Sequence, residues 1–455
     1  MFNRYRRIHF VGIGGVGMSG IAEVLHNLGY EVTGSDMKES EMTARLKNLG
    51  IKVFVGHDAE NIDHAHVVVI SSAVAPDNPE VIEAKYRSIP VIPRAEMLAE
   101  LGRLKYGILI AGAHGKTTTT SLIATTLVEG GFDPTVVIGG KLNAMGSNAK
   151  LGQGAFLVAE ADESDGSFLK LNPTIAVITN IDKEHMDFFK SMEALKQAFL
   201  DFINKIPFYG IAIVCVENAY VREILPQIQR KVLTYGFTYK ADLYARNIRH
   251  LGTRMSFEPV FKGNPLGMFT IPIPGEHNVL NSLAAIAAAI ELQIPISVAA
   301  KALGGFGGIH RRFELKGEKK GIKVFDDYGH HPSEIRATLR AARECFKEQR
   351  ILVLFQPHRY TRTRDSMDEF AASFDDADRL FLMDIYPAGE KPIEGIHSEV
   401  LFKNIEQRGF KNISYIPDRA AMIKAILAEL QPGNVLITLG AGDVYKMGEE
   451  VVREL

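Results

Sequence analysis

Residues 108–117 place an apolar run, glycines, a lysine and a threonine in the order used by phosphate-binding loops. Glycine lets backbone N–H groups turn toward anionic oxygens, and the start of the following helix adds partial positive charge. Lys116 would contact the β- and γ-phosphates, and the Thr117 hydroxyl would hold Mg²⁺. The usual Walker loop has a glycine at position 110, where this sequence has Ile110, so the loop is a shortened form. The predicted ATP-contacting residues of this loop are Gly112, Ala113, His114, Gly115, Lys116, Thr117 and Thr118.

A second glycine loop lies near the start of the chain, between Gly12 and Gly17. Its Gly-x-Gly-x-x-Gly spacing matches the dinucleotide fingerprint, and Asp36 lies where an acid that binds a ribose belongs. The pattern alone fits a nicotinamide dinucleotide, a nucleoside-diphosphate sugar, or a tight turn without a ligand. We favour the diphosphate sugar, because two nucleotide pockets suit a transfer enzyme and nothing else in the sequence resembles a hydride-transfer site.

Acidic residues follow two predicted strands. Glu160 comes directly after the apolar run 156–159, and His185 lies a few residues after the run 175–179. The carboxyl ends of strands in a P-loop sheet are where Mg²⁺ ligands lie. We therefore predict a metal site that includes Thr117, Glu160 and His185, although solvated surface acids would give a similar pattern.

Further polar groups lie in the second half of the chain. Asn278 and Asn281 open a predicted helix, where Asn278 alone would also fit a helix cap. The basic pair 311–312 is too short for a nucleic-acid patch, and Arg312 could instead offset γ-phosphate charge. The segment 326–332 follows a strand, and Arg359 and Arg362 follow the next one, a spacing that suits recognition of a carboxylate.

Three βα series position these residues, and we predict an α/β protein with domains at 1–105, 106–318 and 319–455. A net charge of −2 gives no global basic field for nucleic acid or an anionic membrane. The apolar runs are too short to span a membrane. Only Cys215 and Cys345 are present, which favours a reducing, cytoplasmic compartment. The sequence leaves a homodimer open.

Taken together, the motifs resemble those of the Mur ligase superfamily along essentially the whole chain. They are Gly-Ile-Gly-Gly-Val-Gly-Met-Ser-Gly at 12–20, Ala-His-Gly-Lys-Thr-Thr-Thr at 113–119, Glu-Ala-Asp-Glu-Ser-Asp at 160–165, Asn-Ile-Asp-Lys-Glu-His-Met-Asp at 180–187, His-Asn-Val-Leu-Asn at 277–281, Arg-Arg-Phe-Glu at 311–314, Asp-Asp-Tyr-Gly-His-His-Pro at 326–332 and Gln-Pro-His-Arg-Tyr-Thr-Arg-Thr at 356–363.

This resemblance implies a Rossmann-like N-terminal domain that binds a UDP-sugar, a P-loop ATPase-type central domain and a Rossmann-like C-terminal domain. It implies an ATP-dependent ligase of peptidoglycan precursor synthesis, which joins L-alanine to the lactyl carboxylate of UDP-N-acetylmuramate through an acyl phosphate. Lys116, His330 and Arg312 are the implied catalytic residues. The implied UDP-sugar residues are Gly14, Gly15, Val16, Gly17, Asp36, Ser71 and Arg94; those at the ATP are His277, Asn278, Asn281, Arg312 and Asp327; those at the amino acid and carboxylate are Tyr328, His330, Arg359 and Arg362.

Three other functions remain open at this point. The nearest is a sister ligase that attaches a ready-made murein peptide to the same UDP-sugar, which would need a more open amine pocket. A nicotinamide oxidoreductase would use the first glycine loop but leaves the Lys116 loop unexplained. A nucleotide-regulated binding module would bind ATP without turnover.

Overall fold

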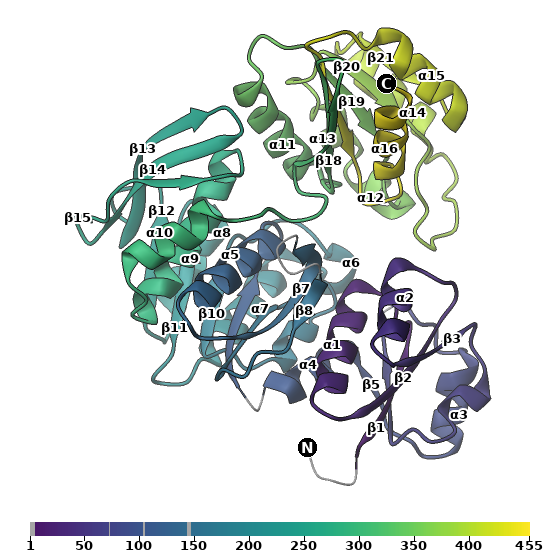
Figure 1. The fold of residues 1–455 in the computed structure, drawn as a ribbon, viewed down its shortest axis with the longest axis vertical. Coiled ribbons are helices and arrows are strands. Elements are labelled where there is room, and N and C mark those ends of the chain that lie inside the picture. The colour runs from purple at the N-terminus through teal and green to yellow at the C-terminus, as the bar shows by residue number, and fades with distance from the viewer. Residues whose placement is uncertain (1–4, 72, 103–104, 143–146) are drawn as a thin grey trace. The chain divides into compact units, whose positions relative to one another are not determined.

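The computed structural model describes residues 5–71, 73–102, 105–142 and 147–455. The chain packs into two compact units, shown as a ribbon in Figure 1. The first comprises residues 1–246, 258–269 and 280–307, and the second comprises 247–257, 270–279 and 308–455. Within the described ranges, every helix is too short or too polar to cross a membrane.

The first unit begins with a five-stranded parallel sheet in the order β3-β2-β1-β4-β5. The glycine loop follows β1, whose neighbours β2 and β4 lie on opposite sides, so it opens at the point where the strand order reverses. Apolar residues of α1, including Ile21 and Leu25, pack against Phe10 of β1. The elements are β1 (Arg7–Val11), α1 (Val16–Asn27), β2 (Glu31–Asp36), α2 (Glu41–Asn48), β3 (Lys52–Val55), β4 (Val67–Ile70), α3 (Pro79–Tyr86), β5 (Val91–Pro93) and α4 (Arg94–Gly102).

A second sheet in this unit carries the lysine loop. From β12 to β8 its order is β12-β11-β10-β6-β9-β7-β8, and the loop follows β6, between β10 and β9. Its buried strands are continuous apolar runs, as expected for parallel strands covered on both faces. The elements are β6 (Tyr106–Ala111), α5 (Lys116–Glu129), β7 (Thr135–Leu142), β8 (Ser147–Lys150), β9 (Phe156–Glu160), β10 (Ile175–Ile178), α6 (Met186–Phe189), α7 (Met192–Asn204), β11 (Ile211–Cys215), α8 (Ala219–Ile224) and β12 (Val232–Gly236).

The chain continues through strands and helices that lead to the second unit. These are β13 (Leu243–Leu251), β14 (Arg254–Phe261), β15 (Asn264–Pro265), β16 (Phe269–Ile271), α9 (Glu276–Glu291) and α10 (Ile296–Gly304). Because α9 begins at Glu276, Asn278 lies inside its first turn, and the interpretation of Asn278 as the helix cap is wrong. The Asn278 Nδ2 instead donates to the Pro274 carbonyl oxygen at 2.7 Å.

The second unit contains a third sheet in the order β17-β18-β22-β19-β20-β21, parallel except for the β17–β18 pair. The sheet starts at Glu314, a few residues before the predicted boundary between 318 and 319. The elements are β17 (Glu314–Lys319), β18 (Ile322–Asp327), α11 (Pro332–Cys345), β19 (Ile351–Phe355), α12 (Tyr360–Asp365), α13 (Met367–Ala371), β20 (Arg379–Leu382), α14 (Ser398–Gln407), β21 (Ile413–Tyr415), α15 (Arg419–Glu429), β22 (Val435–Leu439) and α16 (Tyr445–Glu454). The predicted α/β class with parallel sheets is confirmed.

Candidate active site

The backbone of the lysine loop requires glycine at two positions. Gly112 has φ +138°, and a Cβ there would lie 2.2 Å from the Thr179 Oγ1. Gly115 has φ +81°, and a Cβ there would lie 2.7 Å from the Asn281 Oδ1. Any side chain at either position would be strained and would collide with its neighbour. The two glycines of the shortened loop are therefore fixed by the geometry of the loop itself.

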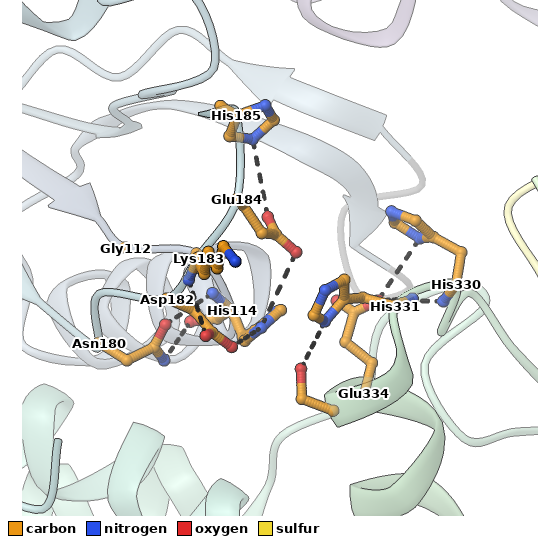
Figure 2. Close-up of polar contacts among 12 residues, drawn as sticks. Gly112, His114, Asn180, Asp182, Lys183, Glu184, His185, His330, His331 and Glu334 are labelled. Carbon is orange, nitrogen blue, oxygen red and sulfur yellow. Dashed lines mark hydrogen bonds and ion pairs between the residues drawn. The ribbon is translucent and has the colours of Figure 1, made fainter. Parts of the chain in front are cut away.

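Side chains from β10 and its following loop hold the turn around His114. The His114 N–H donates to the Asn180 Oδ1 at 2.9 Å, and the Thr179 hydroxyl donates to the His114 carbonyl oxygen at 2.6 Å. Figure 2 shows Asn180 and Asp182 beside His114, whose Nε2 lies 3.2 Å from the Asp182 Oδ2. Asn281 also contacts the start of α5, where its Oδ1 accepts a hydrogen bond from Thr119 at 3.1 Å.

Lys116 is folded back onto its own loop. Its Nζ donates to the Gly112 carbonyl oxygen at 2.6 Å and lies 2.9 and 3.0 Å from the two carboxylate oxygens of Glu163. Burial opposes the charge, but the neighbouring carboxylates, Glu163 first among them, outweigh it and raise the pKa of Lys116 above its usual value. Lys116 is therefore a fixed cation at the loop, with Glu163 as its counter-ion.

The predicted metal residues lie at the carboxyl edge of the second sheet: Thr117 in the first turn of α5, Glu160 at the end of β9 and His185 in the segment after β10. The Glu160 Oε1 accepts a hydrogen bond from the Gly139 N–H at 2.6 Å, which fixes this carboxylate at the end of its strand. His185 has a left-handed backbone (φ +57°) just before α6, and its Nε2 lies 3.6 Å from the Glu184 Oε2. Figure 2 shows Glu184 and His185 side by side.

One grouping here differs from the predicted set. Ligand atoms of Glu163, Glu184 and His185 all lie within 4.8 Å of one another. Two carboxylates and an imidazole provide oxygen and nitrogen ligands, and oxygen ligands are what Mg²⁺ prefers. The donor set therefore fits a divalent cation, and it includes two candidate ligands, Glu163 and Glu184, that the sequence patterns did not single out.

The first glycine loop is contacted by the polar residues predicted with it. The Gly14 N–H donates to the Asp36 Oδ2 at 2.9 Å. A Cβ at Gly12 would lie 3.1 Å from the Ser71 Oγ, and one at Gly17 would lie 2.7 Å from Arg94 Nη1. Residues from three separate segments thus meet at one loop. The helix that follows this loop, α1, has no side-chain cap at its N-terminus.

Arg94 also contacts the acidic segment after β9. Its Nη2 lies 3.3 Å from the Asp162 Oδ2. Burial would raise the pKa of Asp162, but Lys116, the hydrogen bond from the Ser164 N–H and Arg94 together lower it below its usual value. Arg94 therefore contacts both the first glycine loop and the acids that follow β9.

The arginine pair in the second unit divides into two environments. Arg311 is buried, donates to the Asp326 Oδ2 at 2.9 Å and to the Gly442 carbonyl oxygen at 3.0 Å. Arg312 is more exposed, and its guanidinium lies 5.3 Å from the centre of the Tyr328 ring. Arg311 therefore holds the fold, and Arg312 is the one that remains available to a ligand.

The segment after β18 is held by two carboxylates. Asp327 accepts hydrogen bonds from the N–H groups of Phe313 and Gly329, both at 2.8 Å, so this carboxylate shapes the loop. The Glu334 Oε2 accepts from the N–H groups of His330 (3.0 Å) and His331 (3.2 Å), as Figure 2 shows. The loop is thus fixed by buried or half-buried carboxylates at both ends.

The residues predicted at the amino acid and carboxylate gather around His358. The His330 and His358 rings are 5.9 Å apart, and the Arg362 Nη1 lies 3.3 Å from the His358 Nδ1. Arg359 has φ +72°, a strained backbone of the kind that clusters at functional sites. Burial lowers the pKa of His330 to about 3; the Glu334 carboxylate opposes this shift and the Arg362 guanidinium adds to it. His330 is therefore neutral near pH 7.

His277 lies at a cavity of about 500 Å³ in the second unit. Charged side chains line it, among them Glu276, Arg336, Arg340 and Asp376. Two of the predicted ATP residues thus have different surroundings. His277 lines a polar cavity, while the side-chain amide of Asn278 donates to a backbone carbonyl oxygen.

The sequence matches three family models in succession. They are "Mur ligase family, catalytic domain" over residues 7–106, "Mur ligase middle domain" over 110–289 and "Mur ligase, glutamate ligase domain" over 311–442. A UDP-N-acetylmuramate–L-alanine ligase of Geotalea uraniireducens is 57% identical over 455 residues, which cover 100% of this chain and 99% of the relative. The chain belongs to the Mur ligase family.

Solved structures of Mur ligases share this fold. The UDP-N-acetylmuramate–alanine ligase of Thermotoga maritima is 30% identical with a TM-score of 0.85, and the match covers 98% of each chain. A murein peptide ligase of Psychrobacter arcticus is 25% identical with a TM-score of 0.74, again over 98% of each chain. The three-domain architecture expected from the resemblance is therefore confirmed.

Four polar residues of this Mur ligase were missed as site residues by sequence reasoning. Glu163 and Glu184 lie in acidic runs where the sequence does not distinguish ligand from surface acid. His358 and Glu334 lie beside predicted residues, but only the folded loops bring them against His330. A pairing signal existed for Glu334 alone, because it stands three residues after His331 in a capping box.

Proposed function

We propose that this Mur ligase joins L-alanine to the lactyl carboxylate of UDP-N-acetylmuramate at the expense of ATP, in peptidoglycan precursor synthesis. The observation that carries the proposal is the 57% identity, over the full length of both chains, to a ligase named for this reaction. Two glycine loops, each following a strand with parallel neighbours at the point where the strand order reverses, suit one nucleotide sugar and one ATP.

A carboxylate is a poor acylating agent, so the reaction requires its activation. The lactyl carboxylate attacks the γ-phosphorus of ATP, ADP leaves, and an acyl phosphate forms. Lys116 would leave Glu163 and offset the charge that builds up on the phosphate oxygens, as the lysine of a phosphate loop does. The amine of alanine then attacks the acyl carbon, and phosphate leaves from the tetrahedral intermediate.

Mg²⁺ is the cofactor that the acidic residues support. Thr117 and Glu160 would hold one ion at the phosphates, and Glu163, Glu184 and His185 offer a second donor set. A divalent cation bound there would offset the negative charge of the phosphate oxygens.

Residues of the second unit are the remaining candidates. Arg312, whose half-exposed guanidinium lies beside Tyr328, would contact ATP, while Asp327 shapes the loop beside it. Arg359 and Arg362 would bind a carboxylate. His330 is neutral, so its imidazole can accept a proton from the alanine amine, although a pKa of about 3 makes it a weak base.

A ligase that attaches a murein peptide to the same UDP-sugar is the second candidate. The match to the murein peptide ligase of Psychrobacter arcticus supports this candidate. The support is weaker than that for the alanine ligase, because the Thermotoga maritima enzyme has the higher TM-score. We also propose that the activity is cytoplasmic, because its substrates are nucleotides and both cysteines are free thiols.

The release of ADP tests both candidates. The purified chain is incubated with ATP, Mg²⁺ and UDP-N-acetylmuramate, and L-alanine, glycine, L-serine or a murein tripeptide is added in turn. We expect ADP release to depend on L-alanine and to be slower with glycine and L-serine. If the tripeptide is the one amine substrate that stimulates ADP release, the result supports the peptide ligase. If the chain binds ATP but no amine substrate stimulates ADP release, the result contradicts both candidate functions.

A further inference from the structure

A buried carboxylate beneath the first glycine loop has no role in the site described above. Glu80, at the start of α3, is fully buried. Its Oε2 accepts a hydrogen bond from the Ser35 hydroxyl at 2.6 Å, and its Oε1 accepts one from the Asn61 Nδ2 at 2.6 Å. Two histidines also approach it, with the His57 Nδ1 at 3.2 Å and the His9 Nε2 at 3.7 Å.

This carboxylate is charged despite its burial. Burial alone would raise its pKa, but the nearby His9 ring and the hydrogen bonds from Ser35 and Asn61 outweigh that effect and lower the pKa of Glu80. Its position at the N-terminus of α3 also favours a negative charge. A buried charge is costly unless it is fully paired, so the surrounding groups are bound to Glu80 in a fixed arrangement.

Ser35 connects Glu80 to the backbone of the glycine loop. The Ser35 carbonyl oxygen accepts hydrogen bonds from the N–H groups of Gly12 and Ile13, both at 2.9 Å. The next residue, Asp36, accepts from the Gly14 N–H. Three successive N–H groups of the loop are therefore held by two residues of β2, and the side chain of one of them is fixed by Glu80.

The same contacts set the tautomer of His57. The Ser35 hydroxyl donates its only proton to Glu80, and a carboxylate only accepts, so the His57 Nδ1, 3.0 Å from the Ser35 Oγ, must be the donor. In the neutral ring the Nε2 is then an acceptor. His57 follows β3 at the carboxyl edge of the sheet, and its side chain is 19% exposed.

We propose that Glu80 is a positioning residue for the nucleotide-sugar site, acting through Ser35 on the glycine loop and through His57 on the edge beside it. The inference rests on the proposed function, in which this loop binds the diphosphate of UDP-N-acetylmuramate. Glu80 itself, being buried, touches no substrate. Its effect is to hold the backbone at the start of the loop against β2 and to keep the His57 ring in one tautomer.

The substitution Glu80→Gln tests this role because it keeps the size of the side chain and removes its charge. The amide brings N–H donors against Ser35 or Asn61, so one of those bonds is lost. We expect the KM for UDP-N-acetylmuramate to rise roughly tenfold, the loss from one hydrogen bond to a charged group, with kcat and the KM for ATP and L-alanine changed less than about twofold. The control is Glu83→Gln, on the same helix in a surface pair with Arg87.

A purely structural role would give a different result. Partial unfolding would lower kcat and leave all three KM values unchanged, and circular dichroism would report it. If Glu80→Gln does not fold, Ser35→Ala carries the test, because it removes only the hydroxyl, and its KM for the UDP-sugar should rise several-fold. Calorimetric binding of UDP-N-acetylmuramate without ATP should weaken by the same factor as the KM.

Failure of this inference is distinguishable from failure of the proposed function. An unsubstituted enzyme without alanine-dependent ADP release contradicts the proposed function. An active enzyme in which a folded Glu80→Gln variant, or Ser35→Ala in its place, keeps a normal KM for the UDP-sugar contradicts the role of Glu80 alone.

Discussion

The two glycine loops of the first unit use one backbone device for two purposes. Each follows a parallel strand at the point where the strand order reverses, and each opens a helix. The loop at 12–17 contains no charged side chain, and its polar partners, Asp36, Ser71 and Arg94, come from elsewhere in the chain. The loop at 112–117 carries its own cation, Lys116, and faces acidic residues.

This difference separates binding from chemistry. Backbone N–H groups and a helix N-terminus can hold a diphosphate in the ground state. A lysine that exchanges a carboxylate partner for phosphate oxygens also stabilises charge that develops during the reaction. Substitutions at the first loop should therefore act on KM, and those at the second on kcat.

The largest expected effect is that of Lys116→Ala. Removing the cation should lower kcat roughly 1,000-fold, the scale of losing a group that stabilises transition-state charge, with binding of UDP-N-acetylmuramate unchanged. ADP release measures the first quantity and calorimetry the second. The surface lysine Lys170, paired with Glu96, provides the control substitution Lys170→Ala. Turnover near normal in Lys116→Ala would refute the assignment of the ATP site.

A smaller effect is expected from Glu184→Gln, which tests the metal cluster beside the second loop. Loss of one carboxylate ligand should raise the Mg²⁺ concentration for half-maximal activity roughly tenfold. Chelation of Mg²⁺ should stop both enzymes, and excess Mg²⁺ should restore the variant. Glu193→Gln on α7, an exposed position, is the control. An unchanged Mg²⁺ dependence would show that Glu184 lies outside the metal site.

Asp36→Asn tests the first loop directly. Asparagine can still accept from the Gly14 N–H, but it loses the charge that suits a ribose diol. We expect the KM for UDP-N-acetylmuramate to rise about tenfold with little change in kcat. Asp63→Asn, an exposed residue of the same sheet domain, serves as the control. A fall in kcat at constant KM would contradict the assignment of substrate binding to the first loop and catalysis to the second.

Sequence reasoning was strongest where chemistry is carried by short contiguous motifs. Both glycine loops and the strands before them lie where predicted, since glycine spacing and apolar runs are local signals. The strands β7 and β8 were not predicted, and the helix start near Asn278 was misplaced by two residues. Element boundaries depend on tertiary contacts, such as the bond from Asn278 to Pro274, that no local pattern reveals.

Residues whose role depends on a distant partner could not be ranked from the sequence. Arg311 and Arg312 are identical neighbours in the sequence, but Arg311 is buried against Asp326 and Arg312 is not. Glu163 resembles the other acids of its run, and only folding places it on Lys116. Glu80 lies in an ordinary helix start, and its pairing with Ser35, 45 residues away in sequence, is a product of the sheet order.

In the third sheet the candidate residues are side chains such as His330, and this residue gives the smallest prediction. His330 has a pKa of about 3 in the folded protein against an ordinary value of about 6.5, so between these values the unfolded state binds more protons. Stability therefore falls as the pH drops below about 6.5. His330→Gln removes this pH-dependent loss. We therefore expect the free energy of unfolding of the variant, relative to that of the unsubstituted protein, to be about 1 to 2 kcal/mol higher at pH 5 than at pH 7.5.

Urea unfolding followed by circular dichroism at the two pH values measures this difference, since the chain has no tryptophan to report by fluorescence. His397→Gln, an exposed histidine before α14, is the control and should show a smaller difference. The Nδ1 of His330 lies 3.0 Å from the Tyr328 carbonyl oxygen, and a glutamine amide can replace that donor. An equal loss of stability at pH 5 in the His330 variant and the unsubstituted protein would mean that His330 is readily protonated, and a stronger base than its surroundings indicate.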